Sequence, residues 1–439
     1  MDTSNPDNGS ILIQPATGPI RGSYDPPGDR SITHRALILG SLTDEDSEVC
    51  GSLECEDTVC TRRVLAQLGQ TFTSSEEEDC VTISLGGLQA PSVPLDCGRS
   101  FTTLKLMLGL LATQEFDSVL TGSPELLQRR VTHLVEPLRA MGAEISCEGI
   151  GDSAPLRISG RKLKAGKVEI AVRDAELKST LLLASPYMQG QLRIVEKAPS
   201  RDHSERLMKH MGIAFGRDSG AITLECGQLP KARRIKIAGD MSSAAPFIAA
   251  TVLIPGSELT INQVGFNPGR CGMVKVLSRV EDCVERTKDW QLGSEPVTSL
   301  HVRHCVELPA FNIAPNLSPS MADELPLLAL MATQATGTSY LRGINRLATR
   351  MPDRFLLTAQ ILRSFGADIE LEEDGFTIHG PTQLHGGPVQ CAGDHRLVMM
   401  ATVAALIANG ESTLYGADSI RHSYPGFFAD LKELLVVSA

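Results

Sequence analysis

The sequence predicts a two-domain α/β protein built from six copies of one helix-and-strand unit. A chain of 439 residues is too long for one ordinary hydrophobic core, because domains commonly hold about 100–200 residues. The chain is 42% hydrophobic and 21% charged, which is typical of a globular protein and not of a fibrous or disordered one. One sequence pattern also recurs along the chain, and this repeat predicts the fold class.

Each copy of the repeat contains a small or hydroxyl-bearing residue, a helix rich in alanine, leucine and methionine, a glycine-containing turn and a short β-branched strand. The copies are about 70 residues apart, which is longer than solenoid repeats, so each copy is a small α/β module. The six copies begin near Thr33, Thr102, Lys178, Ser242, Asp323 and His395.

A second, amphipathic helix follows in each module. Its apolar residues recur at i, i+3, i+4 and i+7, and a glycine or chain turn ends it. The first helices are apolar nearly all round, and such helices belong inside a fold, covered by sheets and outer helices. Examples of the second helices begin at Thr61, Thr132, Glu205 and Phe355.

Six modules in a chain with two cores divide naturally as three and three. Pro26–Gly28 and the stretch near Gly239 mark the expected crossings. One domain then spans residues 27–239, and the second spans residues 1–26 plus 240–439. The first strand, Ile11–Ile20, would pair with the C-terminal half, and the two connecting segments would form a hinge beside a cleft.

Composition narrows the class of protein. A net charge of −11 argues against a general nucleic-acid binder, which needs a basic surface. Eleven cysteines in a long chain indicate reduced thiols, and His301, His304 and Cys305 fit a polar strand better than a metal site. The start is polar, and no apolar run reaches the roughly 18 residues of a membrane span. We expect a cytoplasmic monomer that binds small anions, and neither nucleic acid nor membrane.

The clearest local signal for chemistry is the stretch PPGDRSITHR at residues 26–35. A Gly-Asp turn leads into a helix N-terminus that carries Arg30, Ser31 and Arg35. Free backbone N–H groups and two guanidinium groups make an anion site, although a capped helix with surface arginines explains the same residues equally well. Arginines at equivalent places in other modules favour a shared cleft that binds anions. They are Arg129, Arg201, Arg354 and Arg396.

Two acidic segments open later helices. Asp240, with Ser242 and Ser243, is expected to cap a helix by accepting from its free N–H groups. Asp323 and Glu324 open a helix in an apolar setting. A partly buried carboxylate at that place is a candidate acid or base.

The chain resembles the 5-enolpyruvylshikimate-3-phosphate synthase (3-phosphoshikimate 1-carboxyvinyltransferase) family over roughly residues 11–436. The matching stretches are PGDRSITHR, THLVEPLRAMGA, SRDHSER, AGDMSSAAPFIAA, PGRCG, ADELPLLALMA, GDHR and SYPGFF. The resemblance implies two domains, each of three βαβαββ units, in an inside-out α/β barrel. It also implies enolpyruvyl transfer from phosphoenolpyruvate to the 5-hydroxyl of shikimate 3-phosphate, in the shikimate pathway of aromatic amino acid biosynthesis, with no cofactor.

The resemblance assigns a role to residues at matching positions. The contacts implied for shikimate 3-phosphate are Ser31, Arg35, Ser200 and Arg350. The clamp implied for phosphoenolpyruvate is Arg129, Arg354 and Arg396. Asp323 resembles the carboxylate that faces the 5-hydroxyl, and Arg30 takes the place of the catalytic lysine.

Several positions depart from the family pattern. A late basic residue of the phosphoenolpyruvate clamp falls at Asp418, unless a loop shift brings Arg421 there, and five further positions differ. Arg30 keeps a positive charge, but a guanidinium does not share its proton at neutral pH. The loop Asn-Ser-Gly-Thr-Thr-x-Arg reads RSFTTLK here, so Phe101 places a ring where phosphoenolpyruvate approaches bare backbone. Asp174 and Glu176 put two carboxylates beside a phosphate, which is repulsive unless a cation intervenes. Met351 replaces an acid/base glutamate.

These departures gather in the site, whereas the scaffold matches well. We therefore expect weak activity with the two family substrates. Two alternatives stay open: a divergent member that acts on another anionic substrate, and a non-catalytic homologue that keeps an anion cleft. The related UDP-N-acetylglucosamine enolpyruvyl transferase fits the PGDRSITHR and SRDHSER stretches less well.

Overall fold

The computed structural model describes residues 9–75, 79–218, 220–280, 283–344 and 352–435. The chain forms two compact units. The first, called the inserted unit here, comprises Gly28–Ala238 and Gln291–Glu295. The second, called the terminal unit, comprises Met1–Pro27, Gly239–Trp290 and Pro296–Ala439. Among the described residues, no helix is long and apolar enough to cross a membrane.

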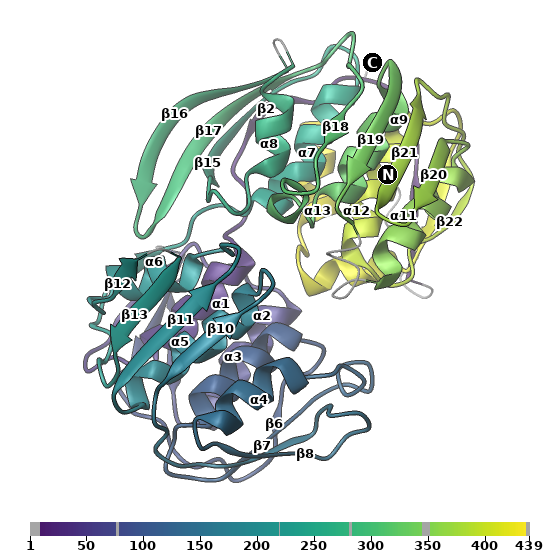
Figure 1. Ribbon diagram of the computed structural model, residues 1–439. Coiled ribbons are helices and arrows are strands. Elements are labelled where there is room, and N and C mark those ends of the chain that lie inside the picture. Colours follow the sequence, from purple (N-terminus) through teal and green to yellow (C-terminus); the bar gives the residue numbers. More distant parts are fainter. Residues whose placement is uncertain (1–8, 76–78, 219, 281–282, 345–351, 436–439) are drawn as a thin grey trace. The chain divides into compact units, whose positions relative to one another are not determined.

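The inserted unit contains three four-stranded sheets, with strand orders β14-β3-β5-β4, β6-β7-β9-β8 and β10-β11-β13-β12 (Figure 1). Each sheet joins one parallel strand pair to antiparallel neighbours. The strands are β3 (Ser47–Cys50), β4 (Thr71–Ser75), β5 (Cys80–Ser84), β6 (Leu95–Asp96), β7 (Ser118–Thr121), β8 (Glu144–Cys147), β9 (Leu156–Ser159), β10 (Lys167–Ile170), β11 (Gln191–Glu196), β12 (Gly216–Asp218), β13 (Ala221–Glu225) and β14 (Arg234–Lys236).

Three helices of the inserted unit are buried on nearly every side, as their all-round apolar sequences require. They are α1 (Arg30–Gly40), α3 (Phe101–Leu111) and α5 (Ala175–Ala184). Each is followed by a helix with one buried face: α2 (Glu56–Gln67), α4 (Thr132–Ala140) and α6 (His203–His210). A 3₁₀ turn, η1 (Ser185–Tyr187), ends α5.

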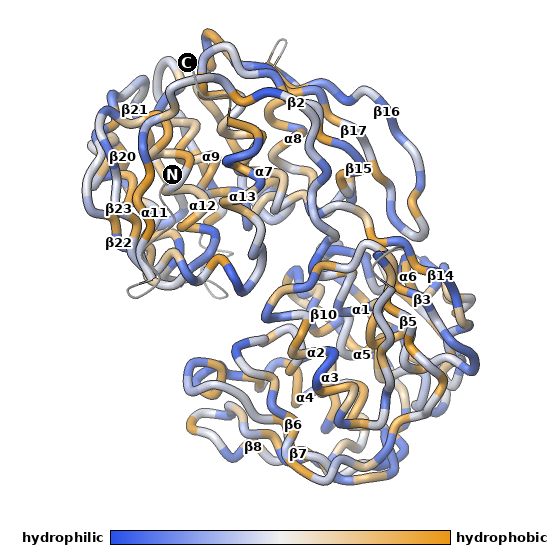
Figure 2. The backbone as a smooth tube through the Cα atoms, turned by 180° about the vertical axis from the view of Figure 1, so that it is seen from behind, coloured by the Kyte–Doolittle hydropathy of each residue, from blue (hydrophilic) through white to orange (hydrophobic). Residues whose placement is uncertain are grey.

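The terminal unit repeats this plan, with sheet orders β16-β17-β15-β2, β18-β19-β21-β20 and β1-β23-β22. Strand β16 carries mostly exposed polar residues, and Figure 2 draws it largely in hydrophilic colours. The strands are β1 (Ser10–Ile13), β2 (Arg21–Tyr24), β15 (Glu258–Gly265), β16 (Val284–Leu292), β17 (Glu295–Arg303), β18 (Asn312–Ile313), β19 (Gly337–Arg342), β20 (Asp368–Glu372), β21 (Gly375–Gly380), β22 (Pro388–Gln390) and β23 (Ser412–Tyr415).

The buried helices of the terminal unit are α7 (Met241–Leu253), α9 (Leu325–Gln334) and α12 (His395–Ile407). The outer helices are α8 (Gly272–Leu277), α11 (Pro352–Ser364) and α13 (Phe427–Leu434), with 3₁₀ turns η2 (Ser318–Ser320) and η3 (Ala417–His422). Strand β1 pairs with β23, so the expected pairing of the first strand with the C-terminal half is confirmed. Its expected end at Ile20 is wrong, because β1 ends at Ile13. The predicted α/β class with six helix-and-strand modules is also confirmed.

The expectation that all cysteines are reduced thiols is wrong at one place. Cys50 and Cys80 form a disulfide, with their Cα atoms 4.0 Å apart. The two residues are direct partners in the antiparallel pairing of β3 with β5. Their juxtaposition depends on strand register, which a count of cysteines cannot supply.

Helices α3 and α5 approach each other closely at Gly109. A Cβ atom built there would lie 2.1 Å from the Thr180 carbonyl oxygen, so a side chain forces the helices apart. In an exposed helix, replacing glycine by alanine stabilises by about 0.5–1 kcal/mol. Here we predict the opposite sign: Gly109→Ala lowers the free energy of unfolding by about 1–3 kcal/mol.

Urea unfolding of the two chains measures this difference. Gly166→Ala is the matched control, because a Cβ at Gly166 meets nothing within 4 Å. A Gly109→Ala chain as stable as the wild type would contradict the close packing of α3 on α5.

Candidate active site

Helix α1 begins directly after a tight turn in the inserted unit. Asp29 is its N-cap and accepts a hydrogen bond from a first-turn N–H at 3.0 Å. A Cβ at Gly28 would lie 2.0 Å from the Gly51 carbonyl oxygen, so only glycine fits this approach. The next residue, Arg30, places Nη1 2.8 Å from Asp57 Oδ2. This partly exposed ion pair joins the start of α1 to the first turn of α2.

Arg35, one turn further along α1, is buried and held on three sides. Its Nε donates to Ser204 Oγ at 2.7 Å, and its Nη2 donates to Ser179 Oγ at 2.7 Å. Its Nη1 donates to the Ser31 carbonyl oxygen at 2.8 Å. Burial lowers the pKa of Arg35 from its ordinary value. The guanidinium is thus a cation of fixed orientation between α1, α5 and α6.

Phe101 opens α3 directly after its N-cap, Ser100, whose hydroxyl oxygen accepts from a first-turn N–H. Lys105 Nζ lies 4.3 Å from the centre of the Phe101 ring. The Arg129 guanidinium carbon lies 4.9 Å from the same centre. Two cations therefore contact this ring, an arrangement that the negative face of an aromatic ring favours.

The two carboxylates at the start of α5 each have a partner. Asp174 is the N-cap of α5 and accepts from the Glu176 and Leu177 N–H groups, both at 3.1 Å. Glu176 forms an ion pair with the buried Lys105. Lys105 thus compensates the charge of Glu176, whereas Asp174 is stabilised by backbone N–H groups at the α5 N-terminus.

The terminal unit gathers three of the candidate residues around one carboxylate. Arg354 Nε lies 2.6 Å from Asp394 Oδ2, and Arg354 Nη1 lies 3.4 Å from Asp323 Oδ1. Asp394 is also the N-cap of α12, since its Oδ1 accepts from the Arg396 N–H at 2.8 Å. Arg396 is buried, and its Nη1 donates to the Ser242 carbonyl oxygen at 3.1 Å.

A second polar group in the terminal unit includes the start of α7. Asp240 caps this helix, as expected, by accepting from the Ser242 N–H at 3.0 Å. Arg270 Nη2 lies 3.0 Å from Asp240 Oδ1 and donates to Ser242 Oγ at 2.6 Å. The Ser242 hydroxyl donates to the buried Glu324 carboxylate. Burial, and secondly the Asp323 charge, raise the pKa of Glu324.

Comparison with known proteins decides the family. A family model described as EPSP synthase (3-phosphoshikimate 1-carboxyvinyltransferase) matches residues 15–431. The chain belongs to this family. It is 37% identical to the 3-phosphoshikimate 1-carboxyvinyltransferase of Synechococcus sp. (strain WH7803), over 96% of this chain and 97% of that protein. It is 38% identical to the protein of the same name from Anaeromyxobacter sp. (strain Fw109-5), over 95% and 96%.

Solved structures agree with this EPSP synthase assignment. The structure of EPSP synthase from Acinetobacter baumannii matches with a TM-score of 0.88 and 29% identity, over 97% of this chain and 98% of that chain. The enolpyruvyl transferase NikO from Streptomyces tendae matches with a TM-score of 0.77 and 15% identity, over 97% and 98%. At that identity, the second likeness shows the fold alone.

The predicted EPSP synthase residues of the inserted unit lie in more than one cluster. In the inserted unit, Arg35 contacts Ser31 directly, whereas Arg129 contacts Phe101 in a separate cluster. In the terminal unit the predicted residues are Asp323, Arg354 and Arg396, as described above. That the candidate residues converge in one cleft stays a prediction. Arg350 and Met351 lie outside the described residues.

Several residues of these clusters carried no recognised signal in the sequence. One signal in the sequence could have indicated such a residue. Lys178 lies in the mostly apolar stretch LKSTLLLA, and a charged side chain at such a place needs a buried partner. The partners come from distant strands and helices, so no sequence spacing indicates them. The residues whose contacts were not predicted are Asp57, Arg270, which lies in the matching stretch PGRCG, and Lys178 and Glu196, which pair with each other in the inserted unit.

His34 of α1 gives a pH test of this architecture. Its Nδ1 lies 2.7 Å from Thr61 Oγ1, and burial lowers its pKa from 6.5 to about 3. Below the ordinary pKa, the unfolded chain binds a proton that the folded chain does not. The stabilising contribution is therefore present above pH 6.5 and is lost as pH falls toward about 3. One proton corresponds to a slope of about 1.4 kcal/mol per pH unit.

In the wild type, the unfolding free energy should fall as the pH decreases from 6 to 4.5. We predict that this fall is less steep in His34→Gln, by up to about 1.4 kcal/mol per pH unit. Urea unfolding at several pH values measures it. The exposed His379 of the terminal unit supplies the control variant, His379→Gln. Equal slopes for the wild type and His34→Gln would show that His34 titrates normally in the folded chain.

Proposed function

We propose that this protein transfers the enolpyruvyl group of phosphoenolpyruvate to the 5-hydroxyl of shikimate 3-phosphate and releases phosphate. The observation that carries this proposal is the family match over residues 15–431. The enolpyruvyl carbon becomes bonded to the 5-oxygen, and the bond from that carbon to the phosphate oxygen breaks. The two substrates carry two phosphates and two carboxylates, so the site must supply fixed cations.

The inserted unit is proposed to hold shikimate 3-phosphate. Arg35 supplies a cation whose orientation is set by Ser179 and Ser204 before any ligand binds. A preorganised guanidinium loses little freedom on binding, which is why such groups hold phosphate well. Ser31 and Ser200 are proposed to add hydroxyl donors to the same phosphate.

The terminal unit is proposed to hold phosphoenolpyruvate through Arg354 and Arg396. Asp323 would accept the proton of the 5-hydroxyl, because a carboxylate within hydrogen-bond reach serves as a general base. Arg354 contacts Asp323 directly, so the cation of the clamp and the proposed base are positioned together. Met351 lies outside the described residues, but its side chain has no ionisable group to take the second acid/base role.

Phe101 limits this activity. The family glycine leaves bare backbone at this position, whereas here a ring contacts Lys105 and Arg129. We predict that turnover by the wild type stays well below about 10 s⁻¹. The double variant Phe101→Gly, Met351→Glu should gain activity, because a missing general acid or base commonly costs about 10²- to 10⁴-fold in rate.

Steady-state phosphate release from the two substrates measures the gain. Leu229→Gly is a control, because it removes an exposed apolar side chain elsewhere in the inserted unit. Wild-type turnover at ordinary enzyme rates would show that Phe101 does not obstruct the site.

A second candidate function is transfer to, or from, a different anionic substrate. The ring of Phe101, covered by two cations and joined through Lys105 to Glu176, favours it, because these residues change the shape of the site as a group. If the double variant has no more activity than the wild type, this second candidate is favoured over the first. A binding screen with phosphorylated and carboxylated metabolites then identifies the ligand. The monomeric state and the cytoplasmic location stay predictions.

A further inference from the structure

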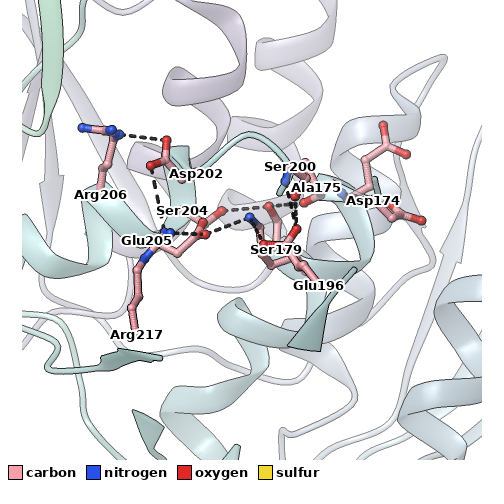
Figure 3. A network of polar contacts seen from close by, with 12 residues as sticks. Asp174, Ala175, Ser179, Glu196, Ser200, Asp202, Ser204, Glu205, Arg206 and Arg217 are labelled. Atoms are coloured by element: carbon pink, nitrogen blue, oxygen red, sulfur yellow. Dashed lines mark hydrogen bonds and ion pairs between the residues drawn. The ribbon is translucent and has the colours of Figure 1, made fainter. Parts of the chain in front are cut away.

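Two pairs of consecutive residues connect α5 and α6 in the inserted unit. Lys178 and Ser179 lie on α5, and Ser204 and Glu205 lie on α6. The Ser204 hydroxyl donates to Ser179 Oγ at 2.8 Å, and Lys178 Nζ lies 2.8 Å from Glu205 Oε1. Figure 3 shows the Ser179–Ser204 contact beside the polar contacts of Glu205 and Glu196.

Lys178 is the centre of this network. Its side chain is 1% exposed, and its Nζ also lies 3.0 Å from Glu196 Oε2. A buried ammonium group is costly unless it is paired, and here two buried carboxylates share it. Arg217 Nη2 adds a second cation 3.1 Å from Glu205 Oε1. Glu196 is therefore held by Lys178, while Oε1 of Glu205 contacts both Lys178 and Arg217.

The other oxygen of Glu196 holds Ser200. Glu196 Oε1 accepts from the Ser200 backbone N–H at 3.1 Å and also from the Ser200 hydroxyl. One carboxylate thus faces Lys178 with one oxygen and Ser200 with the other. Neighbouring residues of α5 in this way orient two of the three proposed phosphate contacts of the inserted unit. Lys178 acts on Ser200 through Glu196, and Ser179 contacts Arg35 directly.

We propose that Glu196, held by Lys178, is a positioning residue that sets Ser200 for the phosphate of shikimate 3-phosphate. This inference rests on the proposed function. In the ligand-free chain the Ser200 hydroxyl donates to Glu196, as described. Rotation about the Ser200 Cβ–Oγ bond turns the hydroxyl hydrogen toward a phosphate oxygen. The hydrogen bond from the Ser200 backbone N–H to Glu196 meanwhile keeps the residue in place. Lys178 compensates the Glu196 charge as the anion arrives.

Glu196→Met tests the proposal, because it keeps the side-chain length, removes both acceptor oxygens and leaves the Lys178–Glu205 pair. Calorimetric titration of shikimate 3-phosphate into the full chain measures affinity. Glu196→Met should weaken binding about tenfold or more, the size expected for losing a charge-assisted hydrogen bond. Ser200→Ala should weaken binding similarly, and the double variant should bind no more weakly than Ser200→Ala.

Glu169→Met is the matched control. Glu169 is a surface carboxylate on the adjacent strand β10, paired with the exposed Lys167, and its loss should leave affinity unchanged. Thermal unfolding of every variant shows whether it is folded. Should Glu196→Met fail to fold, Glu196→Gln replaces it: a single amide oxygen cannot face both Lys178 and Ser200, and the same weakening is expected.

The outcomes distinguish a failure of the proposed function from a failure of the inference about Glu196. A wild type that does not bind shikimate 3-phosphate overturns the proposed function and this inference with it. A wild type that binds, with unchanged affinity in folded Glu196→Met, overturns the inference alone. Effects of Glu196→Met and Ser200→Ala that multiply in the double variant also overturn it, because Glu196 would then not act through Ser200.

Discussion

The burial of six apolar helices is the constraint on which the rest of the structure depends. A helix that is apolar on every side must be covered on every side. Sheets, outer helices and other buried helices provide this cover, as α3 and α5 do for each other. The N-terminal N–H groups of such helices still need acceptors. Side-chain N-caps supply them at five of the six: Asp29, Ser100, Asp174, Asp240 and Asp394.

These helix starts are also where the candidate chemistry lies. Arg30 and Ser31 follow Asp29, Phe101 follows Ser100, and Arg396 lies two residues after Asp394. A helix N-terminus combines free N–H groups with a partial positive charge, so it favours anions. A module whose buried helix begins at such a place offers an anion contact, and a repeat of modules offers several.

Buried charges are the second consequence of this design. Arg35, Lys178 and Arg270 are each nearly fully buried, and each donates to hydroxyl or carboxylate groups of neighbouring elements. Such groups contribute little net stability compared with apolar packing, but removing one partner leaves the other unpaired at a high cost. Their networks hold the candidate site residues in one orientation. These buried charges therefore contribute more to the positioning of side chains than to stability.

Two of the departures from the family pattern, Phe101 and Glu176, have Lys105 as a common partner. Phe101, Lys105 and Glu176 are in contact with one another through the ring and one ion pair, although Glu176 lies on a different helix. This common partner couples the two positions, so a change at one alters the surroundings of the other.

The sequence by itself determined the α/β class, the six modules, the buried and outer helices and the family, because hydrophobic period, glycine ends and motifs are local signals. Only the tertiary structure decided which polar groups pair. The Cys50–Cys80 disulfide depends on strand register. The partners of Lys178 lie 18 and 27 residues away on other elements. The energy of a buried charge depends on what surrounds it in space, and that information is absent from local sequence.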